Sequence, residues 1–419
     1  MKKLSRASRS ITIWIIVAVS SGCAALRGPS GGAVRDAVDA ILDTSPLDQV
    51  HFGVLAVDGR TGRILYSRNA HQKFVPASNQ KILVTATAIS LLGPSYRYGT
   101  EVWATGSVIG SLLDGDLVIL ASGDPSMSDR YWESGEASLA AIADSLYQKG
   151  LRSVAGSVFV DVSAWDSTTV GPTWEVEDLR FPHGATGGAF AIDEGEISVI
   201  IKAGPAVGSP ASLEWFPKGT PDYVRARVTT VPPDSGLQVR SNYLPETRHL
   251  ELTGQIELYE TDTLMFALRD PVRQATAALG TAIDQAGIEL QSGTQVAWSE
   301  GYRVGRGCLS GSVRECPNAG LVLTFESPPL SELIAGILKP SQNWMTEQLI
   351  RTLGTELGEE GSWSEGVGVM SEFLTEVVGI DSLDISPRDG SGLSAYNLVT
   401  PRALVRILQY LSSDQNNGA

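Results

Sequence analysis

Ser78 and Lys81 stand three residues apart in the segment SNQK (residues 78–81), at the start of an apolar stretch that runs to Leu92. In a helix, two residues at this spacing lie on one face within reach of each other. A serine hydroxyl needs an adjacent base to act as a nucleophile, and a lysine whose pKa is lowered by burial can be that base. N–H groups at a helix N-terminus would favour a developing oxyanion. The context favours this interpretation over the alternative, a capping serine followed by a solvated lysine.

Ser341 and Asn343 form a second candidate pair, two residues apart in the segment KPSQN (residues 339–343). A turn between two helices is expected there, so the hydroxyl and the amide can both point into one cleft. Such a pair could relay a proton and hold a peptide carbonyl. A serine that only caps the following helix is the alternative interpretation.

Composition and charge exclude several other functions. The formal net charge of −15 argues against a nucleic-acid-binding protein, which needs a basic face. The four histidines stand in no metal-binding pattern such as HExxH, so we expect neither a metal nor a cofactor. The longest apolar run is also shorter than the roughly 20 residues of a membrane-spanning helix.

The first 23 residues have the layout of a secretory signal, with basic residues followed by the short apolar run ITIWIIVAV. A cysteine directly after the small residues that follow, Cys23, is typical of a bacterial lipoprotein, in which it would carry the lipid. An ordinary cleaved signal and an uncleaved anchor are the alternatives. We therefore expect an exported, periplasmic protein whose contact with a membrane is limited to an N-terminal lipid.

Cys308 and Cys316 lie close together in the Gly/Ser-rich segment GCLSGSVRECPNAG. In an oxidising compartment such a pair predicts a local disulfide. Two free thiols, or a zinc site with ligands from elsewhere, are the alternatives.

Hydrophobic patterning divides the chain into three stretches. The first has a helix over 34–42, a hairpin over 51–67 and a helix to residue 92. Residues 96–318 are rich in strands, expected at 116–121, 157–162, 197–202, 224–230 and 249–256, with helices at 138–149 and 271–286. Helical patterning returns in the last stretch, with helices expected at 330–338, 343–357, 363–378 and 401–412.

Five segments, in order along residues 34–412, together resemble class C penicillin-binding proteins, the D-alanyl-D-alanine carboxypeptidase/endopeptidases of the bacterial periplasm. Ser78 and Ser341 are 341 − 78 = 263 residues apart, a gap that resembles this class, which carries two extra domains between the two motifs. The segments are VPASNQKILVTATAISLLG, ASGDPSMS, GATGGAFAIDEGEISV, ESPPLSELIAGILKPSQNWMTEQLIRTLG and RDGSGLSAYNLVTPRALVRILQYL.

The resemblance implies an α/β (α+β) fold: a penicillin-binding transpeptidase-like domain with an antiparallel sheet and helices, split by a large β-rich insert. The domain would comprise residues 34–95 and 319–419. The insert would occupy 96–318 and hold two domains, the inner one at about 193–260.

The resemblance also implies an activity on peptidoglycan stem peptides. Ser78 would be acylated by the penultimate D-Ala, and Lys81 would take its proton. Ser341 would relay a proton to the leaving D-Ala, and Asn343 would bind the substrate. β-Lactams would acylate the same serine, and no cofactor is implied.

One departure from the family concerns its third motif, Lys-Thr-Gly, which this sequence lacks. In the family the motif and the last sheet strands follow the helix that matches residues 401–412. We therefore expect either a fragment or a degraded relative, and the fragment would be inactive and unstable. A non-catalytic cell-wall-binding relative, or a serine esterase or β-lactamase, would be the alternative functions.

The segment DGSGLS (residues 389–394) is interpreted as a tight turn.

Overall fold

The computed structural model describes residues 31–219, 223–242, 249–297 and 313–413. The predicted signal, Cys23 and Cys308 lie outside these ranges. Cys316, the one cysteine within them, is disulfide-bonded, and its pairing with Cys308 stays a prediction. In the described part of the chain no helix is both long and apolar enough to span a bilayer.

The chain divides into two compact units, one of residues 1–52 and 56–67 and the other of residues 53–55 and 68–419. Helix α1 (Gly31–Leu42) of the first unit is tied to strand β2 (Ile64–Arg68) by a hydrogen bond of 2.6 Å from the Tyr66 hydroxyl to Asp39. Strand β2 pairs with β1 (Val54–Val57). The turn between them is closed by the Asp58 carboxylate, which accepts from the backbone N–H of Thr61 at 2.8 Å.

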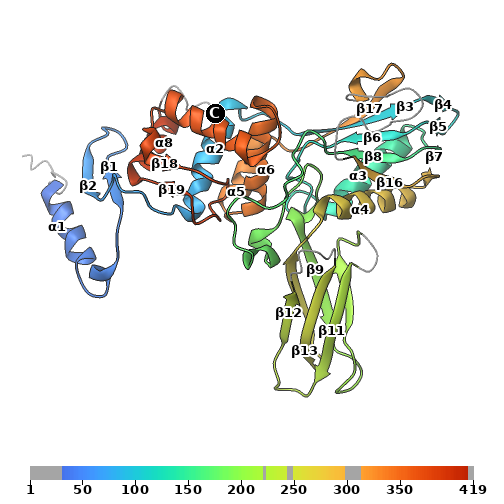
Figure 1. The fold of residues 1–419 in the computed structure, drawn as a ribbon, viewed down its shortest axis with the longest axis horizontal. Helices are drawn as coiled ribbons and strands as arrows, with labels where there is room; N and C mark the ends of the chain where they lie inside the picture. The colour runs from blue at the N-terminus through green and yellow to red at the C-terminus, as the bar shows by residue number, and fades with distance from the viewer. Residues whose placement is uncertain (1–30, 220–222, 243–248, 298–312, 414–419) are drawn as a thin grey trace, which may run out of the picture. The chain divides into compact units, whose positions relative to one another are not determined.

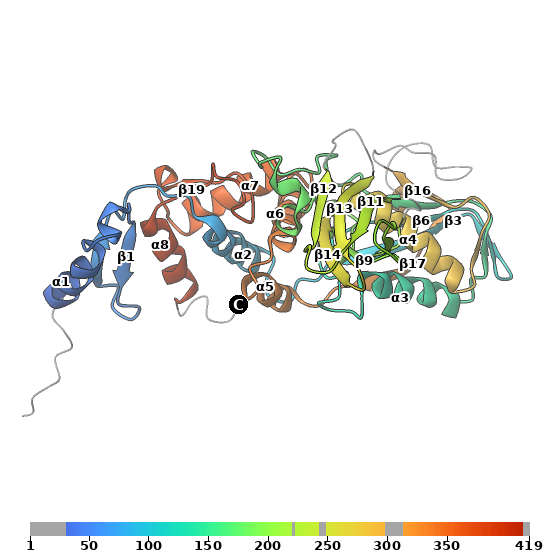
Figure 2. The same ribbon diagram turned by 90° about the horizontal axis from the view of Figure 1, so that it is seen from below.

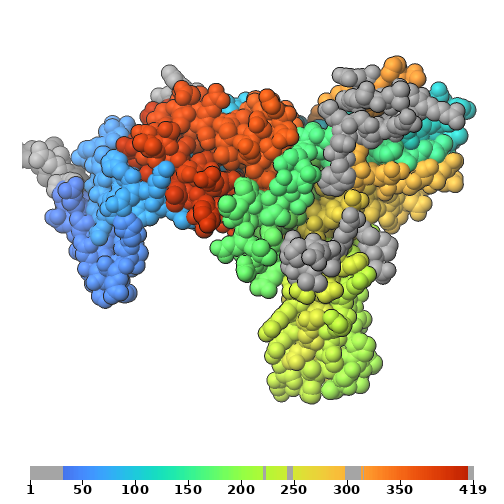
Figure 3. Space-filling model, viewed as in Figure 1, coloured from blue at the N-terminus to red at the C-terminus, as the bar shows by residue number. Residues whose placement is uncertain are grey.

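Helix α2 (Gln80–Leu91) is the centre of the helical region in the second unit. It contacts α5 (Leu330–Leu338), α6 (Asn343–Leu357), α7 (Trp363–Glu372) and α8 (Pro401–Leu411). Figure 1 labels α2, α5, α6 and α8, and Figure 2 labels α7. Eight consecutive or near-consecutive residues of α2 are buried, which fits a helix that is mostly apolar all round. On the face drawn in Figure 3, the orange and red residues of the later helices largely cover α2.

Side-chain caps fix where the later helices begin. The Gln342 side chain accepts a hydrogen bond of 3.0 Å from the Met345 N–H at the start of α6. Thr400 caps α8 in the same way at 3.1 Å, with Pro401 at the first helical position. Helix α7 continues into a π-helical turn (Phe373–Val377), and the short strands β18 (Ile385–Ser386) and β19 (Leu398–Val399) pair beyond it.

Residues 99–326 contain a five-stranded mixed sheet. Its order is β16 (Thr294–Ala297), β8 (Val158–Asp161), β6 (Leu117–Leu120), β3 (Gly99–Thr105) and β17 (Ala319–Glu326). Helices α3 (Gly135–Gln148) and α4 (Pro271–Gln285) pack on each other and on this sheet and share its apolar core (Figure 2). A four-stranded sheet, β15 (Glu289–Leu290), β7 (Ser153–Val154), β5 (Leu112–Asp114) and β4 (Ser107–Ile109), contributes to the same core.

Two three-stranded sheets lie between residues 196 and 267. One is β10 (Ser212–Phe216), β9 (Glu196–Lys202) and β14 (Thr261–Ala267), and the other is β11 (Val224–Val231), β13 (Leu250–Glu257) and β12 (Gln238–Asn242). Burial alternates along β9, as expected for a strand with one face in a core. Residues of both sheets form a single apolar cluster, so the two sheets pack face to face.

The observed architecture is α+β, as predicted, and each predicted helix is present within a few residues of its expected bounds. The five predicted strands of the middle stretch are present as β6, β8, β9, β11 and β13. The domain boundaries proposed from the sequence stay a prediction.

Candidate active site

Ser78 lies at the entrance to α2, in a single 3-10 turn (Ala77–Asn79) that leads into the helix. Its side chain is exposed, while Lys81, one turn further, is only 1% exposed. Ala77 has a positive φ of 46°, an unusual backbone conformation for a residue with a side chain. The sequence-predicted contact is present, because the Lys81 Nζ donates to the Ser78 Oγ at 3.1 Å.

The Lys81 ammonium has three hydrogen-bond acceptors. Besides the Ser78 hydroxyl, its Nζ donates to the Asn343 Oδ1 at 2.7 Å and to the Ser391 carbonyl oxygen at 2.9 Å. Burial lowers the pKa of Lys81 to about 8, against the negative charges of Glu347 and Asp389, which act to raise it. A lysine with this pKa loses its proton far more readily than an exposed one, so it can serve as a base.

Asn343, the first residue of α6, contacts Lys81, a partner that the sequence analysis did not assign to it, and its Nδ2 also donates to the His183 carbonyl oxygen at 2.9 Å. Ser341 is placed differently. It is exposed with a positive φ of 63°, and within the described residues its side chain makes no hydrogen bond to Ser78 or Lys81. The catalytic roles assigned to these four residues stay predictions.

The segment 389–394 is a turn, as interpreted from the sequence, but it also takes part in the site. Gly392 has a φ of +85°, and a Cβ there would lie 1.9 Å from the Ala77 carbonyl oxygen, so only glycine allows this approach. The close approach places the carbonyl of Ser391 on Lys81. Sequence reasoning missed this contact because a backbone carbonyl leaves no trace in residue type.

Sequence reasoning also missed the part that two buried carboxylates near Lys81, those of Glu347 and Asp389, take in the site. The Glu347 carboxylate accepts from the N–H groups of Gly390 (2.9 Å) and Ser391 (2.6 Å) and from the Trp363 indole (2.7 Å). Burial, with the charge of Asp389 as a second cause, raises the pKa of Glu347 above its usual range. The available signal was spacing, because Glu347 lies four residues after Asn343 and so on the same face of α6.

Asp389 anchors the turn to the loop that follows β8. Its carboxylate accepts from the Trp174 indole N–H at 2.9 Å and from the Ser394 N–H at 2.7 Å. Asn397 donates to the other carboxylate oxygen at 2.7 Å. The described residues contain no cluster of His, Cys, Asp or Glu suited to a metal ion.

An accessible serine that contacts a buried lysine of lowered pKa, at the start of a helix, is an arrangement suited to acyl transfer through a covalent serine intermediate. The groups that hold Lys81 come from α6 and from the backbone of the turn at 389–394. The fold and the site therefore define a serine acyl-transfer enzyme.

Comparison with known proteins specifies the family. Residues 34–419 match the D-Ala-D-Ala carboxypeptidase 3 (S13) family. The chain is 27% identical over 413 residues to a D-alanyl-D-alanine carboxypeptidase of Actinomadura sp. (strain R39), covering 96% of this chain and 73% of that protein. It is 22% identical over 368 residues to D-alanyl-D-alanine carboxypeptidase DacB of Haemophilus influenzae, covering 87% and 71% of the two chains.

A solved structure shares the fold. The crystal structure of penicillin binding protein 4 (dacB) from Haemophilus influenzae matches with a TM-score of 0.73 at 21% identity, over 87% of this chain and 76% of that one. The chain belongs to the D-Ala-D-Ala carboxypeptidase 3 (S13) family. The family, the penicillin-binding fold and the enzyme class predicted from the sequence, a serine-type D-Ala-D-Ala carboxypeptidase, are confirmed.

Proposed function

We propose that Ser78 is the nucleophile of this carboxypeptidase and Lys81 its general base. Neutral Lys81 takes the proton of the Ser78 hydroxyl, and the Oγ attacks the carbonyl carbon of the penultimate D-Ala. The C–N bond to the terminal D-Ala then breaks, the leaving amine takes a proton, and an ester remains on Ser78. Water hydrolyses this ester and frees the enzyme.

The observation that carries the proposal is the 3.1 Å contact between the Lys81 Nζ and the Ser78 Oγ, with the lysine buried and the serine exposed. Asn343 holds Lys81 from the other side at 2.7 Å. We assign Ser341 the role of proton donor to the leaving D-Ala. The support for this role is the Ser-Gln-Asn pattern of residues 341–343.

The proposed substrates are peptidoglycan stem peptides ending in D-Ala-D-Ala, and β-lactams are the proposed acylating inhibitors. The family membership supports the substrate. The inhibitor is supported by a second Haemophilus influenzae structure, penicillin binding protein 4 complexed with a β-lactam, which matches this chain with a TM-score of 0.66. Carboxypeptidase and endopeptidase action would use the same residues.

The experiment is D-Ala release from a pentapeptide ending in D-Ala-D-Ala. We expect S78A to reduce release to background, because the variant lacks the hydroxyl that attacks the substrate. The matched control is S90A, which makes the same change near the other end of α2. Release by S78A at the rate of the natural enzyme would contradict the proposal.

We also propose that the protein is exported to the periplasm and anchored through a lipid on Cys23. The support is the sequence of residues 1–23 alone. Metabolic labelling with a palmitate analogue tests it. We expect label on the natural protein and none on C23S, and equal labelling of both would contradict the anchor.

A further inference from the structure

We infer that Glu347 is a positioning residue for catalysis, which holds the turn at 389–394 against Lys81 and keeps a carboxylate beside that lysine. The inference rests on the proposed function of Ser78 and Lys81. Glu347 is not one of the four site residues predicted from the sequence, so the inference adds a fifth residue to the site.

The geometry begins with the contacts of the Glu347 carboxylate. Its Oε1 accepts the Ser391 N–H at 2.6 Å, and its Oε2 accepts the Gly390 N–H at 2.9 Å. The carbonyl of the same Ser391 accepts from the Lys81 Nζ at 2.9 Å. Glu347 therefore lies one peptide unit from the catalytic lysine and fixes the direction of the carbonyl that holds it.

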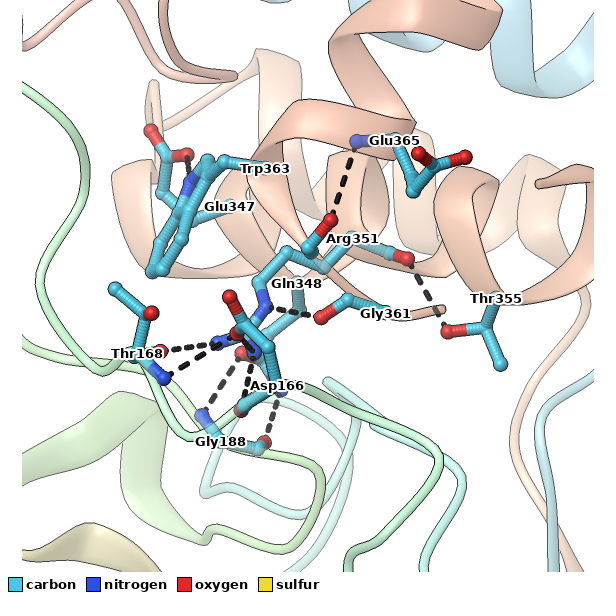
Figure 4. A network of polar contacts seen from close by, with 11 residues as sticks. Asp166, Thr168, Gly188, Glu347, Gln348, Arg351, Thr355, Gly361, Trp363 and Glu365 are labelled. Atoms are coloured by element: carbon cyan, nitrogen blue, oxygen red, sulfur yellow. Dashed lines mark hydrogen bonds and ion pairs between the residues drawn. The ribbon is translucent and has the colours of Figure 1, made fainter. Parts of the chain in front are cut away.

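The carboxylate is itself held on its other side. The Trp363 indole N–H donates to the Oε2 at 2.7 Å, and Figure 4 shows the ring between Glu347 and Arg351. The Arg351 guanidinium lies over the Trp363 ring at 4.5 Å and over the Trp165 ring at 4.3 Å, and it pairs with Asp166 at 2.7 Å. Glu347 is thus fixed between this stack and the turn.

Three donors facing one carboxylate make a neutral amide a poor replacement. Glu347 offers two acceptor oxygens to the indole and to the two backbone N–H groups. A glutamine offers one oxygen, and its NH₂ group would face at least one of these donors. The variant E347Q therefore leaves a buried donor without an acceptor and displaces the Ser391 carbonyl from Lys81.

The charge of Glu347 acts on Lys81 as well. The charged groups that face Lys81 are Glu347 on α6 and Asp389 in the turn, and both raise its pKa against the effect of burial. Arg351 is the cation that acts on Glu347 from its own helix. Removing the charge of Glu347 leaves Asp389 alone, so the pKa of Lys81 falls below about 8 in E347Q.

These two effects give the variant a distinct signature. Acylation requires neutral Lys81, so its rate in the natural enzyme rises as pH increases through about 8. In E347Q we expect this rise at a pH lower by at least about half a unit. We expect the maximal acylation rate to fall by up to about 10-fold. A residue that only supported the fold would lower the rate and leave the position of the rise unchanged.

The experiment measures the rate of Ser78 acylation by a labelled penicillin from pH 5.5 to 10, with the melting temperature of each variant. The conservative variant E347D keeps the charge, so we expect the rise near its natural pH with a lower maximum. The matched control is E356Q, the same change at an exposed residue of α6 whose carboxylate accepts from the Tyr96 hydroxyl at 3.0 Å. We expect it to keep the natural profile.

If E347Q does not fold, W363F carries the test, because it removes one donor from the carboxylate and leaves both backbone contacts. Losing that donor raises the pKa of Glu347, so the rise in acylation shifts in the same direction as in E347Q, by less. A natural pH profile in E347Q, or in W363F where E347Q is unfolded, overturns the inference. A natural enzyme that forms no adduct on Ser78 overturns the proposed function instead, so the two failures are distinguishable.

Discussion

The helical region around α2 and the paired sheets of residues 196–267 bury very different side chains. The sheets share an apolar cluster in which residues such as Ile197, Val199 and Ile201 are at most 1% exposed. The helical region buries Lys81 and Glu347 as deeply, each at 1% exposure. Burying a charge costs free energy unless it is paired and hydrogen-bonded. Lys81 and Glu347 each have three hydrogen-bond partners, so the helical region keeps two ionisable groups buried beside Ser78, whereas the sheets bury apolar side chains.

From this contrast between the two regions we expect the largest loss of acylation when Lys81 is substituted. The variant K81R keeps the positive charge, but a guanidinium cannot lose its proton at working pH. We expect acylation by penicillin to fall by about 10²-fold or more, the size of a lost general base. Stopped-flow or quenched labelling measures the rate. Near-natural acylation by folded K81R would show that Lys81 is not the base.

A smaller effect is expected at Asn343, which orients Lys81 without exchanging a proton in the proposed mechanism. N343A removes the acceptor at 2.7 Å from the Lys81 Nζ and the donor to the His183 carbonyl. Hydrogen bonds to charged groups contribute about 1.5–3 kcal/mol, so we expect acylation to be roughly 10- to 100-fold slower. The control is N318A, at an exposed residue before β17. Equal rates for the two variants would remove Asn343 from the site.

The smallest effect is expected in the sheets. I201V removes one methylene from a fully buried position of β9, which lowers the local free energy of unfolding by about 1 kcal/mol. Hydrogen exchange of the β9 amides measures it, with I109V at an exposed position of β4 as the control. The acylation rate and its pH profile should stay natural. A shifted pH profile in I201V would remove the distinction between the two regions.

What the sequence predicts best depends on local signals. The bounds of α5 and α6 are predicted to the residue, because apolar periodicity and helix caps are local. Strand β3 was missed, since its partners β6 and β17 lie elsewhere in the chain, and Gly99 pairs with Glu326. Long-range pairing of this kind has no counterpart in a short window of sequence.

The contacts of the site also divide into those that local sequence predicts and those that depend on long-range packing. The contact between Ser78 and Lys81 follows from helical spacing within one turn. The contribution of Ser391 could not be predicted, because its carbonyl reaches Lys81 only through the close packing of Gly392 on Ala77. For Ser341 the sequence predicts more than the structure shows. Its motif predicts a role in the cleft, but within the described residues its side chain makes no hydrogen bond to Ser78 or Lys81.

The central claim is that Ser78 is the acylated residue, and mapping of the penicillin adduct tests it most directly. The natural enzyme is incubated with a labelled penicillin, digested and analysed by mass spectrometry. We predict one adduct on the peptide that contains Ser78 and none in S78A. An adduct on another residue, or one that persists in S78A, would contradict the account.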